Sequence, residues 1–283
     1  MADDSGVDYV LWHYRPSLAG GVVACIAFCL LAIFHTWRLI RTRLWFCTPI
    51  IVGAFFETIG YAGRAAAHND MDSITPYVIQ SLLILLAPIL FAASIYMILG
   101  RIIRAAQAGS YCLIRPNWVT KIFVGGDVFC FLMQSTGGGL LAKAEDVDDV
   151  NMGENIILGG LILQILIFGF FVVVATVLHK RLSQRPTMRS CQFAWQRYMW
   201  CLYFVSALIT IRNVARCAEY GLGRDGYLMV NEWCLYVYDF ALMFICVLAC
   251  LVWYNLAALP SPIDMVHGAT ALENQTLRPK VGP

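Results

Sequence analysis

Ionisable and polar side chains recur at helical spacing inside otherwise apolar stretches of this sequence. Glu57, Tyr61 and Arg64 are four and three residues apart, so on a helix they share one face. An acid on such a face could bind an amine or carry a proton, whereas an arginine could hold a neighbouring helix or bind a phosphate. The same spacing recurs in two later segments, and further polar residues extend the set: Arg212, Arg216 and Glu219; Glu232, Tyr236 and Asp239; Asp127, Gln134 and Gly138; Gln80; Gln164.

The composition around these residues is that of a membrane protein. Of the 283 residues, 60% are hydrophobic and only 13% are charged, and the mean hydropathy is +0.68. Soluble domains carry about 25% charged residues, so this chain has too few to cover an ordinary water-facing surface. The formal net charge of +2 does not indicate nucleic acid as a partner. We therefore predict an integral membrane protein.

Apolar runs of about 20 residues or more, the length that a helix needs to cross roughly 30 Å of hydrocarbon, recur along the chain. The alternation of apolar and polar residues that a barrel requires is absent. The runs predict an all-α fold, a seven-transmembrane-helix bundle over residues 17–257, with an extracellular tail at 1–16 and a disordered cytoplasmic tail at 258–283. The runs are Ser17–Trp37, Cys47–Ala67, Pro76–Leu99, Trp118–Leu141, Gly153–Leu178, Tyr198–Cys217 and Trp233–Leu256.

The charges between the runs predict the orientation of the bundle. The connections after the first, third and fifth runs are basic. The connections after the second, fourth and sixth runs are acidic. Because basic loops stay in the cytoplasm, we expect the N-terminus outside and the C-terminus inside. The basic residues are Arg38, Arg41, Arg43, Arg101, Arg104, Arg115, Lys121, Lys180, Arg181, Arg185, Arg189 and Arg197, and the acidic ones are Asp70, Asp72, Glu145, Asp146, Asp148, Asp149, Glu154 and Asp225.

Charged side chains inside a membrane need partners, because each costs about 2.5–3.5 kcal/mol at mid-helix on insertion. If the last two helices are antiparallel neighbours, residues equally far from their connecting loop lie at equal depth. This predicts an ion pair between Arg212 and Asp239. It also places Arg216 close to Glu219 or Glu232.

The count of charges leaves a surplus of acids. Three cations and five carboxylates lie within or beside the runs, so two acids are unmatched. An unmatched acid in a membrane interior is stabilised by a proton or by a bound cation. The candidate substrate-binding residues are Glu57, Tyr61, Gln80, Asp127, Gln134, Gln164, Glu232, Tyr236 and Asp239, and the candidate structural ion pairs involve Arg64, Arg212, Arg216 and Glu219.

A purely structural role is the alternative for each of these residues, since buried ion pairs and glutamines also lock helices together. No spacing typical of a metal site, a phosphate loop or a catalytic triad occurs, so we predict no metal, no cofactor, no catalytic residue and no ATP hydrolysis. Cys217 and Cys234 lie near the ends of adjacent runs, and the sequence leaves open both their pairing and the oligomeric state.

Short motifs recur in a characteristic order along the chain. They are Tyr14-Arg15-Pro16-Ser17, Glu57, Gly60-Tyr61, Arg64, Tyr77-Val78-Ile79-Gln80, Ala87-Pro88, Tyr96-Met97, Gly100-Arg101, Asp127, Gln134, Gly137-Gly138-Gly139, Gln164, Ile211-Arg212, Arg216, Glu219, Glu232, Tyr236 and Asp239. In this order they resemble the fungal lipid-translocating exporter family, the RTA-like proteins of aminocholesterol resistance. The resemblance covers about Tyr14 to Tyr254, nearly the whole chain.

The resemblance implies a seven-helix fungal membrane protein, linked to export of sphingoid bases and phospholipids, to tolerance of amphipathic toxicants and, in one branch, to porphyrin or haem traffic. We expect an ATP-independent transporter or floppase in the plasma membrane, with membrane lipids or amphipathic small molecules as its partners. Two other classes stay open. One is a seven-helix lipid sensor or receptor, and the other is a membrane enzyme that uses an intramembrane acid.

Overall fold

A computed structural model describes residues 16–68, 74–141, 146–188, 190–192, 194–222, 227 and 231–258. Every regular element in these ranges is helical, which confirms the all-α prediction. Several predicted features lie outside the described residues: the N-terminal tail before Pro16, the C-terminal tail beyond Ala258, and Asp70, Asp72, Glu145, Arg189 and Asp225.

The long helices follow the apolar runs but extend beyond most of them. The last run forms one continuous helical rod whose winding changes along its length: a short α-helix, a π-helical turn, a second α-helix and a 3₁₀ segment. The long helices are α1 (Leu18–Thr42), α2 (Thr48–Ala67), α3 (Ile74–Ala105), α4 (Pro116–Leu141), α5 (Val147–Gln184) and α6 (Trp195–Gly221). The last rod consists of α8 (Glu232–Leu235), η4 (Tyr236–Ala241), α9 (Leu242–Cys250) and η5 (Leu251–Ala258), and the short connecting elements are η1 (Trp45–Cys47), η2 (Gly109–Tyr111) and η3 (Ser190–Gln192).

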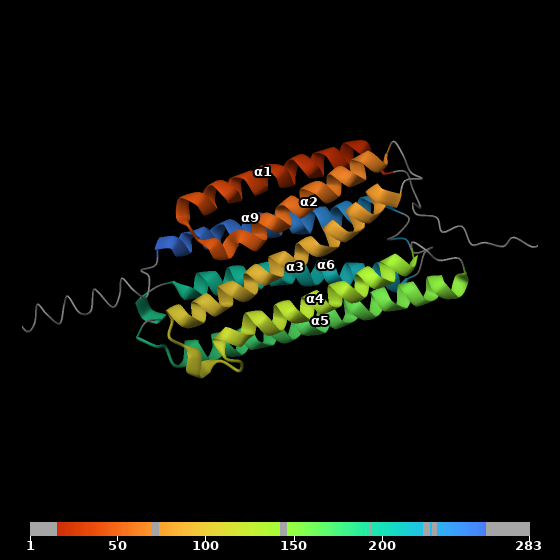
Figure 1. Ribbon diagram of the computed structural model, residues 1–283. Coiled ribbons are helices and arrows are strands. Elements are labelled where there is room, and N and C mark those ends of the chain that lie inside the picture. Colours follow the sequence, from red (N-terminus) through yellow and green to blue (C-terminus); the bar gives the residue numbers. More distant parts are fainter. Residues whose placement is uncertain are drawn as a thin grey trace, which may run out of the picture.

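The helices lie side by side as an elongated bundle (Figure 1). The most extensive contacts join α2 to α3, α4 to α5 and α1 to α2, followed by α3 with α4 and α5 with α6. The rod of α8 to η5 contacts α1, α2 and α6. It therefore lies between the first two helices and α6 and packs against all three. This arrangement brings polar residues of α2, α3, α6 and η4 into one interior.

Six of the long helical segments are long and apolar enough to cross a membrane. α4 is not among them, because Asp127, Gln134 and several glycines interrupt its apolar sequence. The outward face of α1 shows what surrounds the bundle: Val23, Ile26 and Leu30 are 54% to 63% exposed. Apolar side chains that point away from the protein on a spanning helix are suited to contact with lipid. The structure thus supports a multi-pass membrane protein. The six segments are Leu18–Thr42, Trp45–Ala67, Ile79–Ala105, Asp148–Gln184, Trp195–Gly221 and Glu232–Asn255.

The predicted basic connections meet at one end of the bundle. The guanidinium of Arg101, in α3, lies 4.4 Å from the ring centroid of Phe46, which follows α1. Arg181, near the end of α5, donates a hydrogen bond of 3.0 Å to the carbonyl oxygen of Tyr111, which follows α3. The connections after α1, α3 and α5 therefore share one face, as the orientation argument requires.

Glycine allows neighbouring helices to approach closely at some positions and not at others. A Cβ atom at Gly60 would lie 2.7 Å from Ile84 of α3, and one at Gly137 would lie 2.7 Å from the carbonyl oxygen of Gly153 in α5. Gly138, which the sequence placed on the face of Asp127 and Gln134, has open space around it instead. The glycines thus bring α2 against α3 and α4 against α5.

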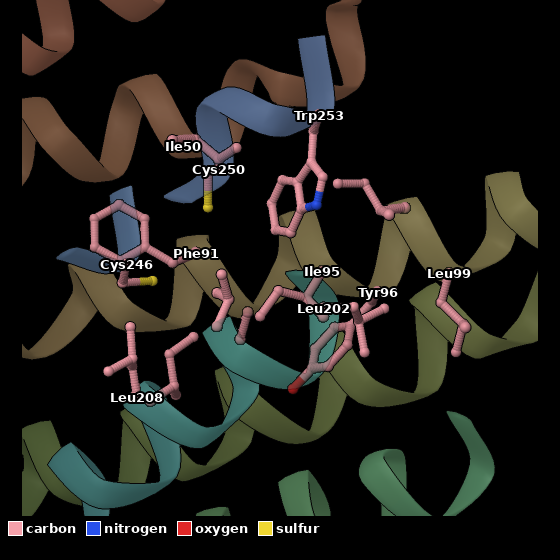
Figure 2. Packing of buried hydrophobic residues seen from close by; sticks show 14 of the residues in the cluster. Ile50, Phe91, Ile95, Tyr96, Leu99, Leu202, Leu208, Cys246, Cys250 and Trp253 are labelled. Carbon is pink, nitrogen blue, oxygen red and sulfur yellow. The ribbon is translucent and has the colours of Figure 1, made fainter. Parts of the chain in front are cut away.

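The apolar core fills the space between α2, α3, α6 and the last rod (Figure 2). Ile50, Phe91 and Trp253 are completely buried there. Cys246 and Cys250 pack among them as small apolar residues. Every cysteine is a free thiol, so the pairing that the sequence left open between Cys217 and Cys234 is not formed.

Candidate functional site

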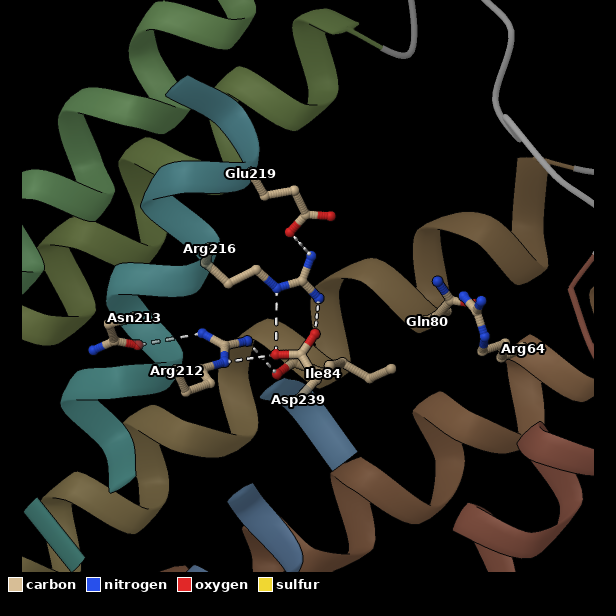
Figure 3. Close-up of polar contacts among 8 residues, drawn as sticks. All are labelled: Arg64, Gln80, Ile84, Arg212, Asn213, Arg216, Glu219 and Asp239. Carbon is tan, nitrogen blue, oxygen red and sulfur yellow. Dashed lines mark hydrogen bonds and ion pairs between the residues drawn. The ribbon is translucent and has the colours of Figure 1, made fainter. Parts of the chain in front are cut away.

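A cluster of charged side chains connects α6 to the π-helical turn η4. The Nε atom of Arg212 lies 2.8 Å from Oδ1 of Asp239, which is the ion pair predicted from equal depth. Arg216 also binds Asp239, and its Nη1 lies 2.9 Å from Oε2 of Glu219. Figure 3 shows both guanidinium groups converging on the one carboxylate of Asp239. We call these four residues the arginine cluster.

Arg212 also donates a hydrogen bond to a backbone carbonyl oxygen of α3 that has no helical partner. Pro88 lies inside this helix and has no N–H, so the carbonyl oxygen of Ile84, four residues earlier, loses its usual partner. Nη2 of Arg212 donates to that oxygen at 3.2 Å, and Nη1 lies 3.4 Å from the side-chain oxygen of Asn213. All three nitrogen atoms of the guanidinium are therefore engaged, and α3, α6 and η4 are joined through one side chain.

The geometry of η4 delivers Asp239 to this cluster. Its six residues, Tyr236–Ala241, are wound as a π-helix. Such turns are rare and are found frequently at functional sites. Within it Asp239 is 1% exposed, so the π turn presents a carboxylate to α6 in a place closed to solvent.

A second set of polar contacts lies beyond the arginine cluster, around Arg64 of α2 (Figure 3). Nη2 of Arg64 lies 2.8 Å from Oε1 of Glu232 in α8. Its Nε donates to the hydroxyl of Tyr236 at 3.3 Å, and its Nη1 lies 3.5 Å from Oε1 of Gln80 in α3. The same Glu232 oxygen accepts a hydrogen bond from the backbone N–H of Ser17, at the start of α1. Arg64 thus joins α2 to α3 and to the last rod, and Glu232 extends the contact to α1; the sequence predicted this role only as an unassigned ion pair.

The ion pairs identify which two acids are unmatched. Arg64, Arg212 and Arg216 pair with Glu219, Glu232 and Asp239, so three cations meet three carboxylates. Within the described ranges, the two remaining intramembrane acids, Glu57 and Asp127, form no ion pair. They differ in their surroundings.

Glu57 is 0% exposed, and neither of its carboxyl oxygens has a hydrogen-bond partner. The hydroxyl of Tyr61, one turn further along α2, has none either. The ring of Tyr61 stacks on Phe28 of α1 with centroids 5.8 Å apart, meets Phe240 of η4 edge to face at 6.0 Å, and lies 6.3 Å from the ring of Tyr236. A polar group without partners therefore adjoins a set of aromatic faces.

Asp127 of α4 lies between α3 and α5 rather than in the arginine cluster. The hydroxyl of Tyr96 donates to its Oδ2 at 2.7 Å, while Oδ1 has no partner. Phe123 and Phe171 pack around the Tyr96 ring, with centroids 5.4 Å and 4.6 Å away. The sequence analysis assigned no role to Tyr96; its signals were its place in the middle of an apolar run and the pair Tyr96-Met97 among the motifs of the family resemblance.

The nine predicted substrate-binding residues do not form one continuous site. Gln80, Glu232 and Tyr236 gather around Arg64, and Asp239 belongs to the arginine cluster. Glu57 and Tyr61 form a separate unpaired position, although Glu57 is close enough to Arg212, Arg216 and Asp239 to interact with them electrostatically. Asp127 lies on the other side of α3, together with Gln134 and Gln164, which form a hydrogen bond of 2.9 Å across α4 and α5.

The chemistry open to this arrangement is that of charge and hydrogen bonding. In the described part of the chain no three histidine, cysteine or acidic side chains come together in a way that could hold a metal ion. Glu57 and Asp127 offer carboxyl oxygens inside the bundle, and the neighbouring tyrosine rings offer faces that attract organic cations.

Several known proteins are similar in sequence to this chain. Protoporphyrin uptake protein 1 of Saccharomyces cerevisiae is 31% identical over 282 residues, which cover 87% of this chain and 91% of that protein. Protein RTA1 of the same yeast is 35% identical over 209 residues, which cover 74% of this chain and 65% of that protein, just under two thirds of its length. The sphingoid long-chain base transporter RSB1, also from this yeast, is 22% identical over 262 residues, which cover 81% of this chain and 69% of that protein.

No solved structure shows a significant match to the chain. The model of the family described as RTA1 like protein matches residues 50–261, from the first turn of α2 to beyond the last helix. This region contains the four ion pairs described above and both unmatched acids. The chain therefore belongs to the RTA1-like protein family.

Proposed function

We propose that this protein is an ATP-independent transporter or floppase that exports amphipathic, lipid-like molecules from the plasma membrane, with a sphingoid base or a phospholipid as the class of substrate. The names of two relatives support membrane transport of lipid-like molecules. One is a protoporphyrin uptake protein and the other is a sphingoid long-chain base transporter. Family membership alone leaves the position of the substrate open. That position is inferred from the unmatched acids.

Glu57 is the observation that carries the proposal. A carboxyl group with no exposure and no partner at either oxygen is costly in a membrane interior unless a cation or a proton joins it. The amine of a lipid head group would supply that positive charge, and the rings of Tyr61, Phe28 and Phe240 would contact the ammonium and the first carbons of its chain. Glu57 and Tyr61 are thus the proposed head-group position.

Asp127 and the Gln134–Gln164 pair provide a second polar position across α3. Oδ1 of Asp127 and Oε1 of Gln134 are both buried acceptors without a donor. A head group that carries hydroxyl or amine donors could pass from one position to the other while its apolar chain stays against the bundle. Gln80, Glu232, Tyr236 and Asp239 hold the helices around the first position through their contacts with the arginines.

The proposed topology has seven crossings, with the N-terminus outside and the C-terminus inside. α4 has 26 residues, about 39 Å at 1.5 Å per residue, which is enough to cross although it is less apolar than the other helices. It packs between α3 and α5, so that its polar side chains face protein. The shared basic end of α1, α3 and α5 then faces the cytoplasm.

Transport in reconstituted vesicles tests the proposal. Purified protein is placed in vesicles with a labelled long-chain base, or in a parallel series a labelled phospholipid, and movement between leaflets is followed by quenching from outside. We expect movement at least tenfold above protein-free vesicles, and loss of most of it in Glu57→Gln. Asp149→Asn is the matched control, since it makes an equivalent change of acid to amide at an exposed position at the start of α5. Movement equal to that in protein-free vesicles, or equal rates in wild type and Glu57→Gln, would contradict the proposal.

A further inference from the structure

The arginines near Glu57 are already paired with other carboxylates. The ionisable groups close enough to interact with it electrostatically are Tyr61 on its own helix, Arg212 and Arg216 of α6, Asp239 of η4 and Cys246 of α9. The two arginines are paired with Asp239 and Glu219, so the two positive and two negative charges of the arginine cluster sum to zero. Glu57 therefore has charged neighbours but no uncommitted cation among them.

A buried carboxyl group in this position can be neutralised in two ways. A proton can bind one of its oxygens, or the positive head group of a substrate can lie beside them. The two are mutually exclusive, because a protonated carboxyl group has no charge with which to hold a cation, and both use the same pair of oxygens. Occupation by one therefore requires departure of the other.

We infer that Glu57 exchanges a proton for the head-group cation of the substrate, which makes the protein a proton antiporter; this inference rests on the proposed function. When the cation enters, the O–H bond of Glu57 breaks, its electron pair stays on the carboxylate oxygen, and the proton leaves to water. When the cation departs, a proton from water restores the O–H bond. The charge of the site is zero in both states, so no charged form of Glu57 is left without a partner.

The structure also indicates a route between Glu57 and the outer end of the bundle. Tyr61 lies one turn further along α2, and its ring faces that of Tyr236. The hydroxyl of Tyr236 accepts a hydrogen bond from Arg64, which is bound to Glu232. The side chain of Glu232 is 21% exposed, whereas Arg64 is 1% exposed, so this series of polar groups leads from the buried acid towards water. An outer route suits an exporter, since a proton from outside would replace the cation that leaves there.

Proton release on binding is the direct test. A long-chain primary amine, adjusted beforehand to the pH of the assay, is added to purified wild-type protein in weakly buffered detergent solution with a pH-indicating dye. At about pH 6 such an amine is fully protonated, so any released proton comes from the protein. We expect about one proton per bound amine in wild type and in Asp149→Asn, and none in Glu57→Gln. Binding without proton release would overturn the inference and leave the proposed function intact; no binding at all would overturn both.

The dependence of binding on pH provides a second measurement that needs no folded variant. If one proton competes with the amine, the affinity of wild type falls tenfold for each unit of pH on the acidic side and levels off on the alkaline side. In vesicles, an outside-acid gradient should then raise export of the labelled base above that of protein-free vesicles in the same gradient, and Glu57→Gln should abolish the increase. An affinity that does not change with pH, or an export rate indifferent to the gradient, would each contradict proton exchange.

Discussion

The two sides of α3 differ in whether their buried acids are paired with cations. On the side of α6 and η4, the arginine cluster matches every cation with a carboxylate, and Asp239 alone serves two guanidinium groups. On the side of α4 and α5, Asp127 pairs with no cation of the described residues and accepts a hydrogen bond from the hydroxyl of Tyr96. The first side is expected to contribute mainly to the stability of the bundle, and the second to be free for binding. Glu57 combines the two, because it lies beside the cluster and yet shares the unmatched state of Asp127.

The largest difference between the two sides should come from neutralising one acid on each. Asp239→Asn leaves Arg212 without its counter-charge in a place closed to solvent, so we expect the free energy of unfolding to fall by about 3–5 kcal/mol. Asp127→Asn keeps an acceptor for Tyr96 and removes no ion pair, so its effect should be within about 1 kcal/mol. Denaturant unfolding of the purified variants measures both. Equal losses would mean that the two sides do not differ in this way.

Double-mutant cycles separate the pairs themselves. Arg212→Met combined with Asp239→Leu should show a coupling free energy of about 1–3 kcal/mol, because each single change leaves a buried charge that the double change removes. The cycle of Gln134→Leu and Gln164→Leu should show about 0.6 kcal/mol, a typical value for hydrogen bonds between membrane helices. A coupling near zero for the first cycle would show that the pair of Arg212 and Asp239 does not stabilise the bundle.

A pair of tyrosines gives the smallest and most local comparison. Tyr96→Phe removes the hydroxyl that donates to Oδ2 of Asp127 and should lower the free energy of unfolding by about 1–3 kcal/mol. Tyr61→Phe removes a hydroxyl group that has no partner, so we expect no loss of stability and even a slight gain. Thermal unfolding of the two variants, with each expressed and purified in parallel, decides the point. A clear loss in Tyr61→Phe would show that its hydroxyl is engaged when the protein is in the membrane.

The helices and one ion pair could be predicted from the sequence because both depend on local spacing. Apolar runs of sufficient length specify the spans. The short connection between the last two helices fixes their relative depth and hence the pairing of Arg212 with Asp239. By contrast, the contact of Arg64 with Glu232 joins segments 168 residues apart, and no spacing rule brings α2 next to α8.

Other features depended on knowing the neighbours in space. Pro88 leaves the carbonyl oxygen of Ile84 without its usual partner, and only the structure shows that Arg212 of α6 binds it. The identity of the two unmatched acids also required the pairs to be known, since the partner of Arg64 and the choice between Glu219 and Glu232 for Arg216 were open in the sequence. The π-helical winding of η4 left no signal in the pattern of apolar residues that we used.

The wide turn of η4 also sets the rotational phase of the last rod. Leu235, Asp239 and Met243 are all buried, each four residues after the previous one. In a regular α-helix four residues overshoot a full turn by about 40°, so two such steps would carry Met243 about 80° away from Leu235. A π turn takes more residues per revolution and absorbs this drift. Deleting one residue between 236 and 241 would therefore turn α9 away from the core by roughly a quarter of a revolution, so the length of this segment is as constrained as its polar residues.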